Sequence, residues 1–221
     1  MQATRVEAVQ PIPSTELPDP PPDLQQIIER GNVRWLTGGP PRETPDSFPA
    51  SLSLAGETRF KFRYRYDSHA RWSYERPSAG QPPTVLLRIR FRSVKLHVSH
   101  EVWLKHVPAA EKFWEDPLVR HECDHVRISS MPAIEQQFLD SVKAMKTVHV
   151  PLADVAGTDG RVSDREVQRW IDRRMDEALE RTTDYVRIRY RELDRLTQHG
   201  RLPIPEDRGL IEISPGAPLN R

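Results

Sequence analysis

Two histidines and a glutamate stand at a spacing that suits metal chemistry in the stretch HECDH, residues 121–125. An α-helix turns by about 100° per residue, so His121 and His125 project from the same side, one turn apart. Two imidazoles at this spacing can bind one zinc ion, with Glu122 placed to take a proton from zinc-activated water. The motif therefore predicts that His121 and His125 are metal ligands and that Glu122 is a catalytic general base.

The two inner residues of the motif are not counted as ligands. The same helical geometry turns Cys123 away from the metal-binding side, while Asp124 flanks that side. A second interpretation stays open at this point, because the two histidines could simply be polar residues at the border of a helical core.

A catalytic zinc ion needs a third protein ligand and one position left for water. Four downstream residues are candidates by residue type: Glu135, His149, Asp159 and His199. Each also has an ordinary structural explanation, such as a solvated strand histidine at position 149, or helix capping at position 199. Spacing alone does not choose among them.

Two alternating segments predict the sheet that supports this helix. In residues 59–66 (RFKFRYRY), aromatic side chains alternate with Lys61, Arg63 and Arg65. Residues 85–104 alternate in the same way with a break near Ser93, and the Gly and Pro residues between the segments predict a turn. We expect a small antiparallel sheet with one buried face.

Helical spacing begins after these strands. Asp116 is a good N-cap residue, and the helix that it starts carries the HECDH motif. Pro132 kinks or restarts the helix. Ser163 and Glu166 form a capping box that opens a long amphipathic helix, which Gly200 ends. The predicted fold class is therefore α+β, with a small antiparallel β-sheet followed by a zinc-binding helix and a long C-terminal amphipathic helix.

Length and composition indicate one main domain with an extension at each end. A chain of 221 residues with 37% hydrophobic content can bury one core. Residues 1–32 are predicted to be a proline-rich tail or linker that can hold a short helix. Residues 33–201 are predicted to form the domain, and residues 202–221 a proline-containing tail.

Charge, cysteine content and hydropathy restrict the partners and the disulfide and membrane-spanning features that the chain can have. The chain has 33 Lys and Arg against 32 Asp and Glu, so no global field attracts nucleic acid or an acidic membrane surface, and neither is expected as a partner. One cysteine excludes an internal disulfide. The chain as given has no apolar run of signal-peptide or membrane-spanning length. We expect it to be soluble, and its localisation stays open.

Motifs between Val33 and Gly200 follow the pattern of one bacterial family. They are a tryptophan before a Gly-Pro loop (RWLTGGPP), a second tryptophan region (SHEVWL), the stretch HECDHVRI and a closing Asp-x-x-Thr-x-His-Gly signature. Their residues outside the HECDH motif are Trp35, Gly39, Pro40, Trp103, Asp194, Thr197, His199 and Gly200. On these residues the chain resembles the bacterial predicted secreted zinc-dependent proteases, long catalogued as a domain of unknown function. Leu193 departs from the pattern, since the family often has tyrosine there.

The resemblance implies a zincin-like metallopeptidase that hydrolyses a peptide or protein substrate. It implies that His121, His125 and His199 bind zinc and that Glu122 is the general base. It also implies an exported or periplasmic location, although a cytoplasmic one is compatible with the missing signal. Asp194 lies slightly more than one helical turn before His199, and two interpretations stay open for it: a solvated charge on the helix, or a residue behind the metal ligands that orients one of them.

Two other functions are compatible with the sequence. In the first, a basic sheet face binds an acidic polymer in a non-catalytic module whose metal is structural or absent. The residues of that face would be Lys61, Arg63, Arg65, Arg88, Arg90 and Arg92. In the second, zinc only joins the last helix to the metal-binding helix, and a fourth protein ligand in place of water would distinguish this function.

Overall fold

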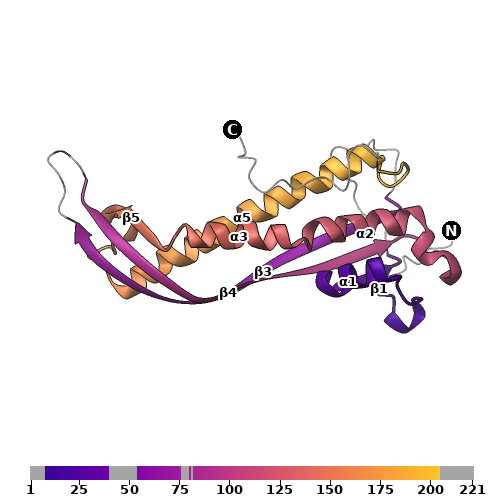
Figure 1. Cartoon of the computed structure of the whole chain (residues 1–221), viewed down its shortest axis with the longest axis horizontal. Helices are drawn as coiled ribbons and strands as arrows, with labels where there is room; N and C mark the ends of the chain where they lie inside the picture. Colours follow the sequence, from indigo (N-terminus) through magenta and orange to yellow (C-terminus); the bar gives the residue numbers. More distant parts are fainter. Residues whose placement is uncertain (1–7, 40–53, 76–79, 81, 205–221) are drawn as a thin grey trace, which may run out of the picture. The chain divides into compact units, whose positions relative to one another are not determined.

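The computed structural model describes residues 8–39, 54–75, 80 and 82–204 (Figure 1). The chain forms two compact units that alternate along the sequence. The first unit is made of residues 1–61, 98–131 and 186–221, and the second of residues 62–97 and 132–185. Pro40, the C-terminal tail after residue 204, and residues 76–79 and 81 of the predicted turn lie outside the described residues.

The protein is α+β, as predicted, but its sheet is mixed rather than antiparallel. Five strands are described: β1 (Gln10–Pro11), β2 (Val33–Thr37), β3 (Gly56–Glu75), β4 (Thr84–Leu104) and β5 (Thr147–Pro151). Their order is β1-β2-β4-β3, and β5 also pairs with β4. The sequence did not predict β2 as a strand, and β2 runs parallel to β4 with Val33 opposite His100. A five-residue strand carries no sequence signal for its pairing direction, which tertiary packing decides.

The two alternating segments do form strands: β3 extends beyond residues 59–66 at both ends, and β4 begins one residue before the predicted segment. β4 continues through the break near Ser93, where Arg92 and Ser93 are both exposed. Two successive exposed residues shift the buried face from odd to even positions, as an extra residue in a strand does. A phase shift, and not a strand end, therefore explains the break.

In the first unit, two helices pack with β2 and the end of β4. They are α1 (Pro22–Gly31) and α2 (Pro117–Ser129), and short 3-10 helices cover Ser14–Glu16 and Ala110–Glu115. Their core contains Leu24, Trp35, Val102, Leu104, Phe113, Val119, Cys123 and Val126. Cys123 lies in this apolar core, where burial raises the pKa of its thiol to about 12, so it is an unreactive packing residue as the helix geometry indicated.

In the second unit, helices cover one face of the hairpin formed by β3 and β4 (Figure 1). They are α3 (Pro132–Lys143), the short α4 (Leu152–Val155) and most of α5 (Asp164–Thr197). Leu87, Phe138 and Ile171 are among the fully buried side chains between them. The Tyr64 hydroxyl donates to Asp176 at 2.6 Å, which ties the hairpin to α5.

α5 begins and ends as its sequence indicates. The Ser163 hydroxyl accepts from the Glu166 backbone N–H at 3.3 Å, so one half of the predicted capping box is present. The helix ends at Thr197, and Gly200 has φ +78°. A Cβ at Gly200 would lie 2.8 Å from the Cβ of His121, so only glycine allows the end of α5 to approach α2 this closely. Among the described residues, no helix is long and apolar enough to cross a membrane.

Candidate metal centre

His121 and His125 lie on one buried side of α2. Asp116 caps this helix by accepting the backbone N–H groups of Leu118 and Val119, and Pro117 occupies the first turn. The two imidazoles are 5% and 4% exposed, and their Nε2 atoms are 3.2 Å apart. The helical spacing of the motif therefore does bring both rings to one point.

Asp194, from the last turns of α5, completes a cluster of three potential ligands. Its Oδ1 lies 3.1 Å from Nε2 of His121 and 3.0 Å from Nε2 of His125. Among the described residues, these three form the group whose donor atoms are close enough together to hold one metal ion. Burial raises the pKa of Asp194, but hydrogen bonds from the two imidazoles outweigh it and hold this pKa well below its usual range.

His199 lies at the edge of the same cluster. Its Nδ1 is 3.4 Å from Asp194 Oδ1, and its side chain is 40% exposed. Burial lowers the pKa of His199, although the charge of Asp194 acts in the opposite direction. The sequence placed His199 on the metal and Asp194 behind it, whereas the structure brings Asp194 into the closest group. That His199 is a ligand stays a prediction.

The other third-ligand candidates do not line the cavity that contains this cluster. Glu135 is exposed on α3, and Asp159 accepts the backbone N–H of Arg161 in a turn. His149 lies on β5, where its Nδ1 is 2.7 Å from Glu75. Their ordinary structural explanations therefore suffice.

Thr197 indicates which nitrogen of His121 carries a proton. The Thr197 hydroxyl donates to the Leu193 carbonyl at 2.8 Å, so its oxygen is left to accept hydrogen bonds. That oxygen lies 3.3 Å from Nδ1 of His121 and accepts the backbone N–H of Gly200 at 3.2 Å. With a proton on Nδ1, the Nε2 of His121 faces Asp194 either with a second proton, which makes the hydrogen bond to the carboxylate described above, or with a lone pair. A metal ion between Nε2 and the carboxylate would take the place of that second proton, so this arrangement suits a metal ion.

Replacing Thr197 with valine is expected to lower metal affinity by about 10- to 100-fold, because valine keeps the shape but cannot accept from His121. Competition with a chromophoric chelator measures this affinity. Thr183→Val is the matched control, because Thr183 makes the same hydrogen bond to a helix carbonyl, that of Leu179, at 2.8 Å in the second unit. Unchanged affinity in Thr197→Val would contradict the assigned tautomer.

Tyr190 packs against the ring of His125 and ends a buried chain of hydrogen bonds. The Gly31 carbonyl can only accept, so His100 donates to it from Nδ1 at 2.5 Å and accepts at Nε2 from the Ser129 hydroxyl. Ser129 in turn accepts from the Tyr190 hydroxyl at 2.9 Å. The Tyr190 ring, 4.3 Å from that of His125 between centroids, is thus held from behind.

Unlike His121, His125 is not oriented by a hydrogen bond to its Nδ1 from the described part of the chain. Its Nδ1 is buried without a hydrogen-bond partner among the described residues. An unpaired buried polar atom is uncommon and tends to occur at functional sites. His125 is therefore positioned by packing against Tyr190, and its Nε2 is the nitrogen directed at the cluster.

Glu122 is buried next to the two histidines. Thr58 donates to Oε2 of Glu122 at 2.6 Å, and a Cβ at Gly56 would lie 2.7 Å from Oε1. Burial raises the pKa of Glu122 to about 7, although the charge of His121 and the hydrogen bond from Thr58 act in the opposite direction. A carboxylate with this pKa can accept and release a proton near neutral pH.

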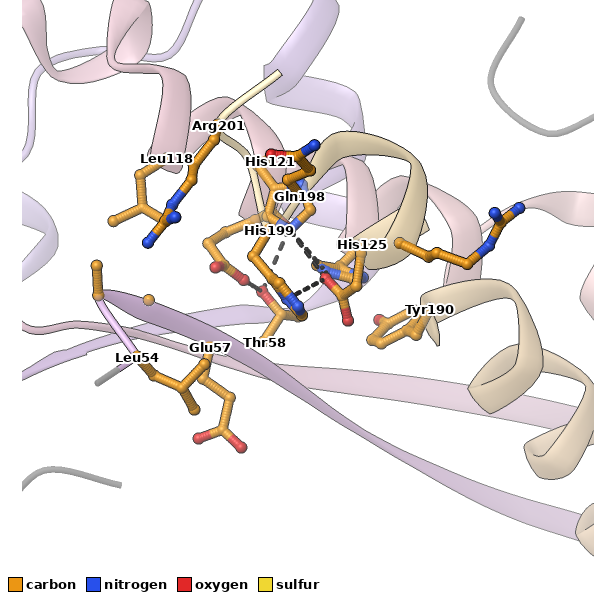
Figure 2. A pocket seen from close by; sticks show the side chains of 15 residues that line it. Leu54, Glu57, Thr58, Leu118, His121, His125, Tyr190, Gln198, His199 and Arg201 are labelled. Atoms are coloured by element: carbon orange, nitrogen blue, oxygen red, sulfur yellow. Dashed lines mark hydrogen bonds and ion pairs between the residues drawn. The ribbon is translucent and has the colours of Figure 1, made fainter. Parts of the chain in front are cut away.

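The cluster opens into a cavity of about 390 Å³ within the first unit. Figure 2 shows His121, His125 and His199 gathered around one point, and Leu54 and Leu118 also line the cavity. The volume is within the range of small-molecule and side-chain binding sites. The cluster thus has room beside it for a substrate group.

Two imidazole nitrogens and one carboxylate oxygen are a donor set that suits zinc. The same set also binds non-haem iron, so residue type alone does not fix the metal. The neighbouring Glu122 is the additional feature that hydrolytic zinc chemistry uses.

Gly56 and Thr58 are site residues that the sequence interpretation missed. Both precede the alternating segment at residues 59–66, and nothing local links them to Glu122. A glycine at the start of a strand can mark a close approach of another group, which was the one available signal.

A fold class does not by itself imply a function, so the chemistry of this cluster carries the functional argument. The cluster combines three metal donors, a buried carboxylic acid and an adjoining cavity. Comparisons with protein-family models, curated proteins and solved structures found no match to this chain.

Proposed function

We propose that the protein is a zinc-dependent metallopeptidase of the zincin-like kind that its sequence motifs resemble. The observation that carries the proposal is the convergence of His121, His125 and Asp194 beside the buried Glu122 in one cavity. Histidine, histidine and a carboxylate are ligands of known catalytic zinc sites, and a fourth position is left for water.

In this proposal each ligand has support that fixes its orientation. Thr197 holds His121, Tyr190 packs against His125, and Asp194 arrives from the end of α5. When bound there, zinc supplies Lewis-acid polarisation of the peptide carbonyl and lowers the pKa of water.

Glu122 is the proposed general base and then the general acid. It takes a proton from the attacking water and delivers it to the nitrogen of the leaving amine, so proton number is conserved over the cycle. Thr58 donates to one carboxylate oxygen, and Gly56 leaves room for the other. The side chain is therefore held in place while its protonation state changes.

His199 has two compatible roles. As a fourth ligand it would close the coordination sphere and favour the structural function of zinc. As a donor beside the cavity it could hydrogen-bond to the polarised carbonyl of the substrate. The cavity next to the cluster favours the second role, because a purely structural site has no use for adjoining space.

The direct test is metal content together with hydrolysis. We expect about one zinc ion per chain in purified protein, loss of activity on a quenched fluorescent peptide library after chelation, and recovery on adding zinc. Chelation should also lower the unfolding temperature, since a ligand present at about 100 times its Kd stabilises by about 2.7 kcal/mol. Full peptidase activity in metal-free protein would refute the mechanism, and a stoichiometric zinc protein without hydrolysis would refute the proposed function.

A further inference from the structure

The outer face of the hairpin in the second unit carries an almost uniform positive charge. In β3 and β4, aromatic and aliphatic residues on the inner side alternate with exposed basic residues on the outer side. We call seven of these exposed residues the basic face: Arg63, Arg65, Arg71, Arg88, Arg90, Arg92 and Lys95. Residues 62–97 contain eight Lys and Arg against two Asp and Glu, in a chain that is nearly neutral as a whole.

The charges of the basic face are not neutralised locally. Arg92 lies 3.6 Å from Asp67, and no ion pair joins the other six members to a carboxylate among the described residues. The surface of α5 differs in composition, since residues 164–197 contain nine Arg and nine Asp and Glu, and Arg169 pairs with Glu166 and Arg174 with Glu177 there. The two signs are thus interspersed on the helix, whereas one sign dominates the sheet face.

This concentration of one sign is unfavourable for the sheet alone. Like charges on neighbouring strands repel, and most protein surfaces intersperse the two signs. Serine or threonine would keep these positions soluble without repulsion. An anionic partner would turn the repulsion into attraction.

The residue types narrow the chemistry of that partner. Six of the seven residues are arginine, whose planar fork of N–H donors matches phosphate oxygens in pairs. Among the exposed large hydrophobic residues of the described chain, Tyr74 is the one on β3 or β4, and its hydroxyl accepts from the backbone N–H of Val162 near the start of α5. In the described strands no exposed apolar or aromatic side chain thus lies between the members of the face, which disfavours insertion into a bilayer and stacking on single-stranded bases.

The shape of the basic face further restricts the class of anionic partner. Figure 1 shows the hairpin curving around the helices of the second unit, so its outer side is convex. The face lies on β3 and β4, and β5 adds a third strand beside residues 84–88 of β4. The major groove of B-form DNA admits a two-stranded ribbon, whereas a bilayer presents a flat surface. From Arg63 to Arg71 the strand spans about 26 Å at roughly 3.3 Å per residue, which is the length of about eight base pairs.

We propose that the basic face binds the phosphate backbone of double-stranded DNA without sequence specificity. The charge balance of the whole chain argued against nucleic acid, but the structure segregates the charge onto one face. The proposal does not depend on the metal centre, which belongs to the other unit.

Fluorescence anisotropy of a labelled duplex of about 25 base pairs, titrated with the full chain, tests this proposal. We expect a Kd of about 1–100 µM near physiological salt, with log K falling linearly against log salt. The triple variant Arg88→Gln, Arg90→Gln, Arg92→Gln should bind at least about tenfold more weakly and lose about three units of salt slope. The matched control, Arg165→Gln, Arg169→Gln, Arg181→Gln, changes net charge equally on exposed positions of α5 and should bind like the unmodified chain.

Three outcomes would overturn the proposal. The first is no binding of the duplex at low salt, and the second is equal weakening by the two triple variants, which would show an effect of net charge alone. The third is binding to phosphatidylglycerol-containing vesicles without binding to the duplex, which would assign the face to a membrane surface. Circular dichroism of each variant checks that the sheet is intact.

Discussion

Replacing Glu122 with glutamine is expected to leave zinc bound and to lower kcat on peptide substrates by about 10²- to 10⁴-fold. Glutamine keeps the size of the side chain and can still accept from Thr58, so the fold around it is retained. Glutamine cannot take a proton from water, so we expect a large decrease in kcat, the rate constant of the chemical step, and little change in KM.

The measurement pairs kinetics with metal analysis on the same preparation. Glu135→Gln is the matched control, because it makes the same chemical change on an exposed position of α3 and should leave kcat within experimental error. Glu122→Gln with unchanged kcat and full zinc would contradict the assigned role of Glu122. If zinc is lost as well, the residue acts on metal binding and the division of roles is wrong.

The sequence was most informative where one local segment carries the whole signal. The spacing in HECDH predicted that two rings share a side of α2, and Asp116 predicted where this helix begins. The capping residues at Ser163 and Glu166 did the same for α5. These features depend on helix geometry and end effects, which act over a few residues.

Local sequence patterns did not predict the contacts between segments that are distant in the chain. Spacing could not show that Asp194 reaches both imidazoles, because its position depends on how α5 ends against α2. Gly56 and Thr58 reach Glu122 from more than sixty residues away. The parallel pairing of β2 with β4 is of the same kind. In each case tertiary packing decides, and residue type alone does not reveal it.

The zinc affinities of two alanine variants show whether Asp194 or His199 is the third ligand. Because Asp194 Oδ1 lies within about 3 Å of both imidazole nitrogens, we expect Asp194→Ala to weaken zinc binding by more than about 100-fold. His199→Ala should weaken it by less than about 100-fold, because loss of a residue behind a ligand costs about 10- to 100-fold. Chelator competition gives both affinities, and cobalt substitution reports the coordination number from the visible spectrum.

If His199→Ala weakens zinc binding more than Asp194→Ala does, the arrangement is the one that the family resemblance implies, with His199 on the metal and Asp194 orienting that histidine. Losses above about 100-fold in both variants, together with a four-coordinate cobalt spectrum, would mean that four protein ligands close the site, and the peptidase proposal would then fail. His106→Ala removes an exposed histidine from the same unit and controls for general effects on stability. His199 is partly exposed, whereas Asp194 contacts two buried imidazole rings, so the structure favours a greater loss of zinc affinity in Asp194→Ala than in His199→Ala.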